Sequence, residues 1–329
     1  MVKRFELFTP MKRPLLCILM ALAMPPLIIA APDESHTWTD PDAARREDPD
    51  FAIQGEYRHE TMGAQVVALG GGKFDLYLLE GGLPGAGWEP GHSRILLKGE
   101  KSYFSDAASK TTAKLEEEVL SVTKADGTKQ ELKRIERQSP TLEAKPPANA
   151  INLSADQWEN AKVENGFLTA NGSTTRSRFG SYTLHLEFRT PYKPDARGQK
   201  RGNSGVYHSG RWETQILDSF GLEGRDNECG GLYSIAKPKL NMCLPPLTWQ
   251  TYDVEFTAAK FDASGQRTAW PRLTVRLNGV VIHDNVELPK DFTTSAPLST
   301  PLTGPEGPIH LQQHDNPVVF RNIWLIPGQ

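Results

Sequence analysis

Apolar and polar side chains alternate along much of this chain with a period of two residues. In the segment 181–190, every second residue from Tyr182 to Phe188 is large and apolar, and the residues between them are polar or charged. Shorter segments at 73–79, 251–257 and 273–277 repeat the pattern. This period indicates strands with one buried face. Helical periodicity is nearly absent, so the pattern predicts an all-β protein built as a two-sheet sandwich.

Turn residues separate the predicted strands. Asn278-Gly279 stands between two alternating runs, which is the strongest short-range signal for a hairpin. Gly70-Gly71-Gly72 divides two strands near the N-terminus. No helix and no Gly-Lys-Ser/Thr motif follow these glycines, so we interpret them as a turn and not as a phosphate-binding loop.

Changes in composition suggest five regions. A proline- and alanine-rich stretch, with Pro146-Pro147, is typical of a semi-rigid linker. The predicted regions are a signal peptide (1–31), a polar tether (32–50), a small β-rich domain (51–138), a linker (139–150) and a β-sandwich domain (151–327).

The N-terminus resembles an export signal. Lys12 and Arg13 precede the apolar run Leu15–Ala31, which ends in small residues. The alternative is an uncleaved anchor, and translation could start at Met1 or at Met11. No other stretch is long and apolar enough to span a bilayer. We therefore expect a periplasmic or secreted protein whose mature chain has no membrane span.

Cysteine content and charge narrow the picture further. Of the three cysteines, Cys17 lies in the predicted signal, and Cys229 and Cys243 remain. An even pair in an exported chain predicts a Cys229–Cys243 disulfide, with two unrelated buried thiols as the alternative. The formal net charge is −3, and no basic run with interleaved aromatic residues occurs, so a nucleic-acid partner is not expected.

The segment 201–220 concentrates polar chemistry. If it forms a strand, Tyr207, Arg211, Glu213 and Gln215 share one face, and apolar residues occupy most of the other. His208 falls on the apolar side, where we expect a hydrogen-bonded structural histidine. A solvated face could also give this pattern, but a carboxylate between a cation and an amide favours a functional site.

Here the sequence resembles a known family, the 3-keto-disaccharide hydrolases. The motifs that carry the resemblance, in order, are Gly202-Asn-Ser-Gly-Val-Tyr207, Arg211-Trp-Glu-Thr-Gln-Ile-Leu-Asp218, Cys229-Gly-Gly-Leu-Tyr233, Trp249-Gln-Thr-Tyr-Asp253, Asn278-Gly279 with His283-Asp-Asn285, and Gly307-Pro-Ile309 through Leu311-Gln312 and His314 to Phe320-Arg-Asn-Ile-Trp324. The family ending usually has aspartate where this chain has Gln313.

The resemblance implies a concanavalin-like jelly roll that cleaves glycosides oxidised at C3. A C3 ketone acidifies the C2 proton, so a base can remove it and expel the C1 substituent, after which water adds. Such an enzyme needs a base and a group that stabilises the enolate oxygen. Glu213 or His314 could be the base, and Arg211, Gln215 or a metal could stabilise the enolate.

Further residues of these motifs complete the predicted site. The expected substrate-binding residues are Asn203, Tyr207, Gln215, Gln312 and Arg321. No cofactor is certain. A divalent metal ion could be held by Glu213 and Asp218, whereas a zinc site is not expected, because the cysteines and histidines lack the usual spacing.

Two other functions stay open at this point. The same fold could serve as a non-catalytic carbohydrate-binding module, since a fold does not fix a function. The domain 51–138 could dock the protein to a protein or cell-surface partner. An ordinary glycosidase is less well supported, because Glu213 has no second carboxylate in register.

Overall fold

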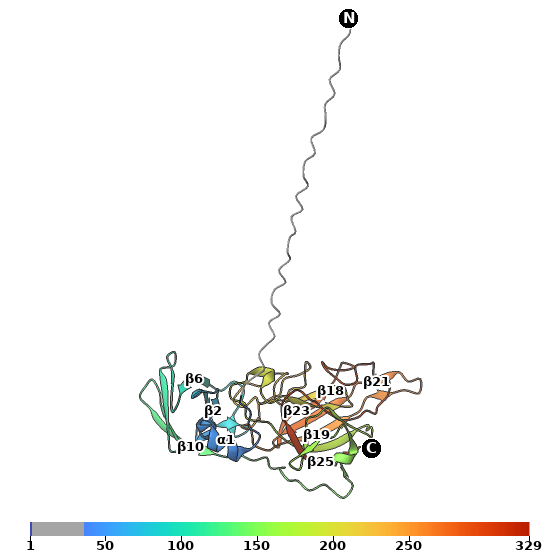
Figure 1. Ribbon diagram of the computed structural model, residues 1–329, viewed down its shortest axis with the longest axis horizontal. Coiled ribbons are helices and arrows are strands. Elements are labelled where there is room, and N and C mark those ends of the chain that lie inside the picture. Colours follow the sequence, from blue (N-terminus) through green and yellow to red (C-terminus); the bar gives the residue numbers. More distant parts are fainter. Residues whose placement is uncertain (2–35, 329) are drawn as a thin grey trace. The chain divides into compact units, whose positions relative to one another are not determined.

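The computed structural model describes residue 1 and residues 36–328 of the chain, so the predicted signal peptide and Cys17 lie outside the described residues. Strands dominate this part of the chain, as the alternation predicts (Figure 1). No helix among the described residues has the length and apolar character needed to cross a membrane.

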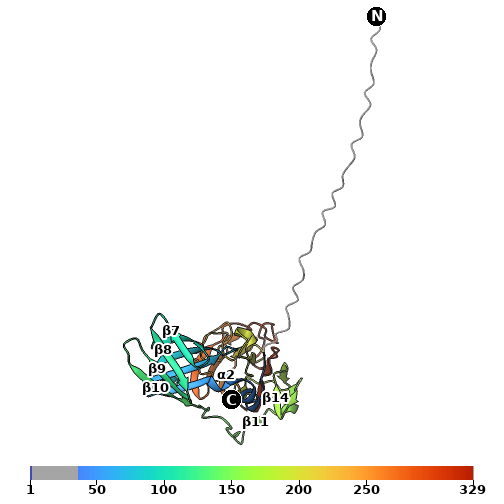
Figure 2. The same cartoon turned by 60° about the vertical axis from the view of Figure 1, so that its left-hand side comes forward.

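The first group of strands closes into an antiparallel barrel in the order β1-β10-β9-β8-β7-β6-β3-β2. The strands are β1 (Gly55–His59), β2 (Met62–Ala68), β3 (Lys73–Glu80), β6 (Arg94–Glu100), β7 (Tyr103–Asp106), β8 (Thr111–Glu116), β9 (Val119–Thr123) and β10 (Lys129–Ile135). The connection between β3 and β6 carries β4 (Leu83–Pro84) and β5 (Gly87–Trp88). Figure 2 shows β7 to β10 side by side.

Two short helices precede the barrel, where the sequence predicts part of a polar tether. They are α1 (Pro41–Glu47) and α2 (Pro49–Ile53). Asp40 and Asp48 cap their N-termini, and a proline follows each cap. Ala44 of α1 is fully buried with the barrel core. Aspartate followed by proline is a helix-start signal, and the tether interpretation overlooked it.

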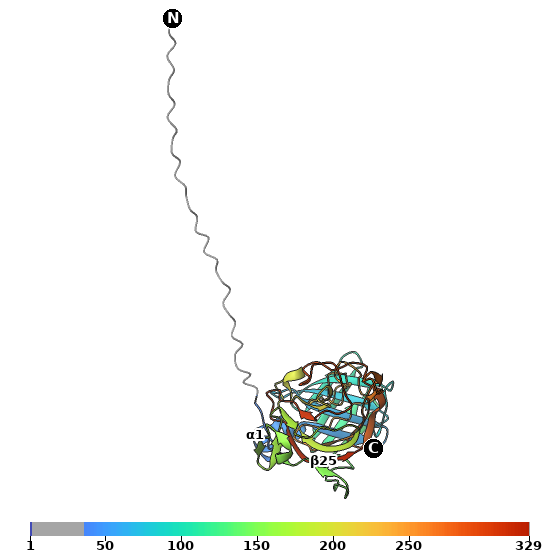
Figure 3. The same cartoon turned by 90° about the vertical axis from the view of Figure 1, so that its right-hand side faces the viewer.

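The second group forms the predicted sandwich. One sheet has the order β13-β14-β25-β16-β19-β22-β23, with β11 also paired to β25, and the other has the order β12-β15-β24-β17-β18. The strands of the first sheet are β11 (Ile151–Asn152), β13 (Val163–Glu164), β14 (Phe167–Thr169), β16 (Tyr182–Arg189), β19 (Gln250–Thr257), β22 (Arg272–Leu277), β23 (Val280–Glu287) and β25 (Val319–Pro327), the last of which is labelled in Figure 3. Those of the second are β12 (Trp158–Glu159), β15 (Ser173–Thr175), β17 (Ser204–His208), β18 (Trp212–Ile216) and β24 (His310–Leu311).

Minor elements complete the sandwich. These are the 3-10 turns η1 (Ala155–Gln157) and η2 (Gly198–Lys200) and the ribbon of β20 (Lys260–Phe261) and β21 (Arg267–Ala269). The predicted Asn278-Gly279 hairpin is confirmed. The two residues join β22 to β23 with φ angles of 51° and 80°, the left-handed conformation that a two-residue hairpin loop of this kind requires.

Apolar faces of the two sheets meet in one core. Tyr182, Leu184, Leu186 and Phe188 of β16 are buried there, as the alternation along this strand predicts. Trp158 and Trp212 also belong to this core. The barrel interior forms a separate apolar cluster. Arg201 links the two parts, because it pairs with Asp218 at 2.6 Å and donates to the Ala68 carbonyl of β2.

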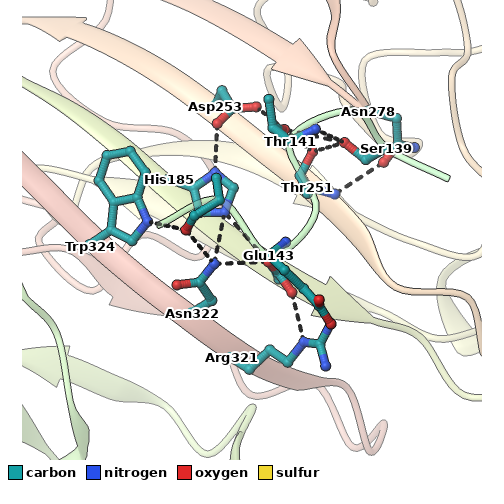
Figure 4. A network of polar contacts seen from close by, with 12 residues as sticks. Ser139, Thr141, Glu143, His185, Thr251, Asp253, Asn278, Arg321, Asn322 and Trp324 are labelled. Carbon is teal, nitrogen blue, oxygen red and sulfur yellow. Dashed lines mark hydrogen bonds and ion pairs between the residues drawn. The ribbon is translucent and has the colours of Figure 1, made fainter. Parts of the chain in front are cut away.

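Residues 139–144, at the start of the predicted linker, bind the polar outer face of the eight-stranded sheet, and we name them the strap (Figure 4). The hydroxyl of Thr251 lies 2.6 Å from Ser139 Oγ and 2.9 Å from Thr141 Oγ1. Thr141 also donates to Asp253 Oδ2 at 2.7 Å. The strap is therefore fixed to β19 by side-chain hydrogen bonds.

Two polar residues of β16 are fully buried beneath the strap. His185 Nδ1 lies 2.6 Å from Asp253 Oδ1, and its ring stacks on Trp324 with 5.0 Å between centroids (Figure 4). Glu187 Oε1 accepts a hydrogen bond of 2.5 Å from the Glu143 backbone N–H. Alternation along β16 places both side chains on the polar face, and the strap is what removes that face from water.

The structure does not show the predicted disulfide. Cys229 and Cys243 are both buried thiols, and their side chains hydrogen-bond to each other. The Cys229 sulfur lies 3.5 Å from the Tyr252 hydroxyl, and the Cys243 thiol is directed at the Leu217 carbonyl at 3.6 Å. The two cysteines thus belong to the apolar core of the sandwich, where a small thiol packs like an apolar residue.

We predict that Thr141→Val lowers the free energy of unfolding by about 1–3 kcal/mol, because the Asp253 carboxylate and the Thr251 hydroxyl lose a buried partner. Urea unfolding measures the change. Thr183→Val, at an exposed position of β16, is the control and should have little effect. Equal stability of the two variants would show that the hydrogen bonds of Thr141 contribute nothing measurable.

Candidate active site

The hairpin of β17 and β18 sets the polar face of the five-stranded sheet. Its register places Tyr207 directly opposite Glu213, and Gly205 opposite Gln215. The chain does not run through 204–216 as one strand, because Ser209 and Gly210, with φ angles of 54° and 64°, turn it back. The hairpin register pairs odd-numbered residues with odd-numbered residues. Tyr207, Glu213 and Gln215 therefore lie on the same face of the sheet, as the sequence predicts.

The opposite face of this hairpin packs into the core. Trp212 and Val206 are buried there, together with His208. His208 bonds the Tyr182 hydroxyl at 2.8 Å and the Thr214 hydroxyl at 2.9 Å. Burial lowers the pKa of His208 to about 3, so the ring is neutral at physiological pH. This histidine is structural, as the sequence indicates.

Glu213 is a buried carboxyl group with one free oxygen. Its side chain is 2% exposed, and its Oε2 accepts a hydrogen bond of 2.8 Å from the Tyr207 hydroxyl. The other oxygen, Oε1, is buried without a partner and lies over Gly205, where any Cβ atom would overlap it. Burial raises the pKa of Glu213 from 4.5 to about 8, although the Tyr207 hydrogen bond acts to lower it. The carboxyl can therefore give or take a proton near neutral pH.

Amide side chains extend the polar face on both sides of Glu213. Gln312, which follows β24, donates to the Tyr207 hydroxyl at 3.1 Å. Asn203 and Gln215 both donate to Gln199 Oε1, at 2.9 and 3.0 Å. The carbonyl oxygens of Gln312 and Asn203 are buried without partners, as Glu213 Oε1 is. Three unpaired acceptors on this polar face favour a ligand that donates hydrogen bonds, such as a polyhydroxylated ring.

His310 of β24 borders the same network. Its ring packs edge-on against Tyr207, with 5.7 Å between centroids. Nδ1 lies 2.8 Å from the Thr174 hydroxyl of β15. Burial lowers the pKa of His310 to about 4, so the imidazole is neutral at physiological pH and cannot serve there as a cation.

Four predicted site residues do not join this network: Arg211, Asp218, Arg321 and His314. The first two lie close to the hairpin but bind other groups. Arg211 donates to the carbonyl oxygens of Asp291 and Thr300 and so holds a loop. Asp218 is paired with Arg201 and is not free to hold a metal ion with Glu213. The predicted roles of Arg211 in stabilising an enolate and of Asp218 in binding a metal therefore lack support.

Arg321 belongs to β25 in the other sheet. It pairs with Glu187 at 2.7 Å, and its guanidinium lies 4.3 Å from the centre of the Trp249 ring. Burying the Glu187 carboxylate requires this cation, which gives Arg321 a structural role in the sheet that the strap covers.

His314 lies beyond the end of β24, in an exposed segment. The prediction that His310, Gln312 and His314 share one strand face assumes a longer strand than the structure has, since β24 ends at Leu311. His310 and Gln312 both contact Tyr207, whereas no such contact joins His314 to the network in the described part of the chain. Glu213 is therefore the better placed of the two predicted bases.

The described residues contain no group of three or more histidine, cysteine, aspartate or glutamate side chains arranged to hold a metal ion. Around Glu213 the other unpaired oxygens belong to amides. A site with one carboxylate and neutral amide oxygens suits the hydroxyl groups of a substrate better than it suits a tightly held divalent cation.

Sequence reasoning missed Gln199 and Thr294. Gln199 lies in η2 and accepts from two amides of the site, and the Thr294 carbonyl oxygen lies 3.0 Å from the Tyr207 hydroxyl oxygen. Neither belongs to a strand, so no periodicity points to them. A cavity of about 440 Å³ opens beside Gln199 and is also lined by Asn227, whose carbonyl accepts from Gln199.

Comparison with known proteins places this arrangement in a family. A family model described as the 3-keto-alpha-glucoside-1,2-lyase-like domain matches residues 145–326, which is more than half of the chain and nearly all of the sandwich. The chain belongs to this family. The match begins after the strap. It includes every residue of the polar network around Glu213, which we name the Glu213 network: Gln199, Asn203, Tyr207, Glu213, Gln215, His310 and Gln312.

Two solved structures resemble this lyase-like domain. One is a candidate glycosyl hydrolase from Parabacteroides distasonis ATCC 8503, with 30% identity over 55% of this chain and 85% of that chain and a TM-score of 0.49. The other, a candidate glycosyl hydrolase from the same organism, has 16% identity over 53% and 89% of the two chains and a TM-score of 0.37. Among curated proteins, none matches this chain.

The raised pKa of Glu213 predicts how stability depends on pH. From about pH 4.5 to about pH 8 the folded protein keeps a proton that the unfolded chain has lost, so the contribution of this group to stability falls as the pH rises through that range. Glu213→Gln removes this contribution, and the variant should gain stability relative to wild type between about pH 5 and about pH 8.

Urea unfolding at several pH values measures the effect, with the exposed Glu255→Gln as the control. A constant difference between Glu213→Gln and wild type across the range would mean that the Glu213 carboxyl titrates normally in the folded protein.

Proposed function

We propose that this protein cleaves the glycosidic bond of 3-keto-glycosides, with Glu213 as the base that removes the C2 proton. The observation that carries the proposal is the Glu213 carboxyl itself, which is buried, has a pKa raised to about 8 and keeps one oxygen free. A base works best when its pKa lies near the operating pH, and a pKa of about 8 places the Glu213 carboxyl in that range. Membership of a lyase-like family supports elimination as the first stage.

The proposed reaction proceeds in two stages without oxidation or reduction. Glu213 takes the C2 proton, and the electron pair of the C2–H bond forms an enolate with the C3 ketone. When the enolate collapses, C1=C2 forms, the C1–O bond breaks and the leaving oxygen receives a proton. Water then adds to C1, and C2 regains a proton, which gives the free 3-keto sugar. The protonated Glu213 is the acid that can donate a proton to the leaving oxygen. After it takes a proton from the attacking water, it can also protonate C2.

The amide network supports substrate binding. A sugar ring that approaches Glu213 meets the unpaired carbonyl oxygens of Asn203 and Gln312, which can accept hydrogen bonds from its hydroxyl groups. Hydrogen bonds to Gln199 and Tyr207 fix the orientation of these two amides. Such preorganised acceptors would hold the C2–H bond toward the base.

We predict that Glu213→Gln lowers turnover of a methyl 3-keto-α-glucoside by roughly 10²-fold or more and changes binding far less, because glutamine keeps the shape but cannot take a proton. Steady-state kinetics and calorimetric binding measure the two effects. Glu255→Gln, an exposed carboxylate of β19, is the matched control. Near wild-type turnover by folded Glu213→Gln protein would remove Glu213 from the mechanism, and sugar binding without any turnover in wild type would indicate a lectin-like module.

Tyr207→Phe tests the pKa of the base. Loss of the hydroxyl removes the hydrogen bond that lowers the pKa of Glu213, so this pKa should rise above about 8. Because the carboxylate is the active form, turnover should increase with pH up to a plateau, and the midpoint should move to higher pH in the variant. The pH profile of kcat measures it, with the exposed Tyr103→Phe as the control. An unchanged midpoint, or a shift to lower pH, would contradict the assignment.

A further inference from the structure

Aromatic side chains fill one end of the barrel. Phe74 and Phe104 meet inside it with 6.1 Å between ring centroids, near the turns at 69–72 and 101–102. Ala44 of α1 packs into the same apolar cluster. The connection 117–118 lies at this end too, and up-and-down connectivity puts the remaining four connections, 60–61, 81–93, 107–110 and 124–128, at the opposite end.

At that opposite end the barrel contains a cavity of about 820 Å³. We name it the barrel mouth. Its apolar wall includes Met62, Leu78 and Ile95, whose strands alternate inward with the core positions of the barrel. A closed barrel of eight strands is wide enough to hold either packed side chains or one small ligand. The volume lies within the range of about 300–1,000 Å³ that is usual for small-molecule sites.

One buried polar atom of the barrel mouth, Gln130 Oε1, has no partner in the described part of the chain. The Ser109 hydroxyl, at the same end of the barrel, hydrogen-bonds the Asp106 carboxylate. The Gln130 amide nitrogen donates to the Thr61 hydroxyl at 3.4 Å, which leaves the carbonyl oxygen free as an acceptor. A buried carbonyl without a donor is unfavourable, so a ligand that donates a hydrogen bond would be retained there.

The lining also indicates the kind of ligand. None of the described residues that line the barrel mouth is phenylalanine, tyrosine or tryptophan, so it offers no broad aromatic ring on which a sugar could stack. Its charged residues, Glu80, Lys124 and Asp126, are exposed at the rim. The interior therefore presents an aliphatic wall and neutral hydrogen-bonding groups.

We propose that the barrel mouth binds a small neutral amphiphile, with its aliphatic body against Met62, Leu78 and Ile95 and a hydroxyl or amide donor on Gln130 Oε1. This site is separate from the Glu213 network, because its lining comes only from the barrel strands and their connections. The barrel then has a binding function of its own, whatever reaction the sandwich performs.

The test uses the full chain and two probes of equal size, 1-octanol and 1-methoxyheptane. Only the alcohol can donate a hydrogen bond, so calorimetric titration should show that it binds about tenfold more tightly than the ether. Gln130→Met removes the acceptor and should make the two affinities equal. Gln266→Met, at an exposed turn, is the control and should keep the preference.

A second variant keeps the test decisive if the first changes the fold. Ile95→Trp narrows the barrel mouth and should weaken 1-octanol binding at least tenfold, while the circular dichroism spectrum stays unchanged. The proposal is overturned if neither probe binds up to its solubility limit, or if both variants bind 1-octanol as wild type does. Trehalose binding that Ile95→Trp abolishes would also overturn it, since the barrel mouth would then be a sugar site.

Discussion

The antiparallel register of β17 and β18 is the constraint on which the proposed chemistry depends. It sets the Tyr207 hydroxyl against the Glu213 carboxyl, and it brings Gly205 beside Gln215. A shift by one residue would turn Glu213 into the apolar core and Trp212 onto the polar face. The burial of Trp212 between the sheets therefore holds the carboxyl in place, so that packing on one side of the sheet fixes chemistry on the other.

Much of the sandwich can be predicted from the sequence, because one buried face per strand leaves a direct trace in the alternation. β16, β19 and the β22–β23 hairpin all follow it. The same alternation is enough to assign Tyr207, Glu213 and Gln215 to a common face. It works even though Ser209 and Gly210 turn the chain, since the hairpin preserves the parity of the faces.

The other features of the site and the core depend on tertiary contacts, which produce no periodic pattern in the sequence. Gln199 reaches the site from an irregular turn, and Arg211 turns away because loop carbonyls at Asp291 and Thr300 bind its guanidinium. The sequence pairs Cys229 with Cys243, and the fold does bring the two buried thiols into contact, but it also gives the Cys229 sulfur the Tyr252 hydroxyl as a neighbour. Tertiary packing decides these positions.

The strap lies outside the family domain but forms part of its folded surface. The family match begins at residue 145, yet residues 139–144 cover His185 and Glu187, which lie within the matched region. A segment outside the inherited domain thus completes its outer surface in this chain. If recombination moved residues 145–326 alone into another protein, the strap would be lost. The side chains of Glu187 and His185 would then become exposed to water, unless a segment of the new protein packed over them.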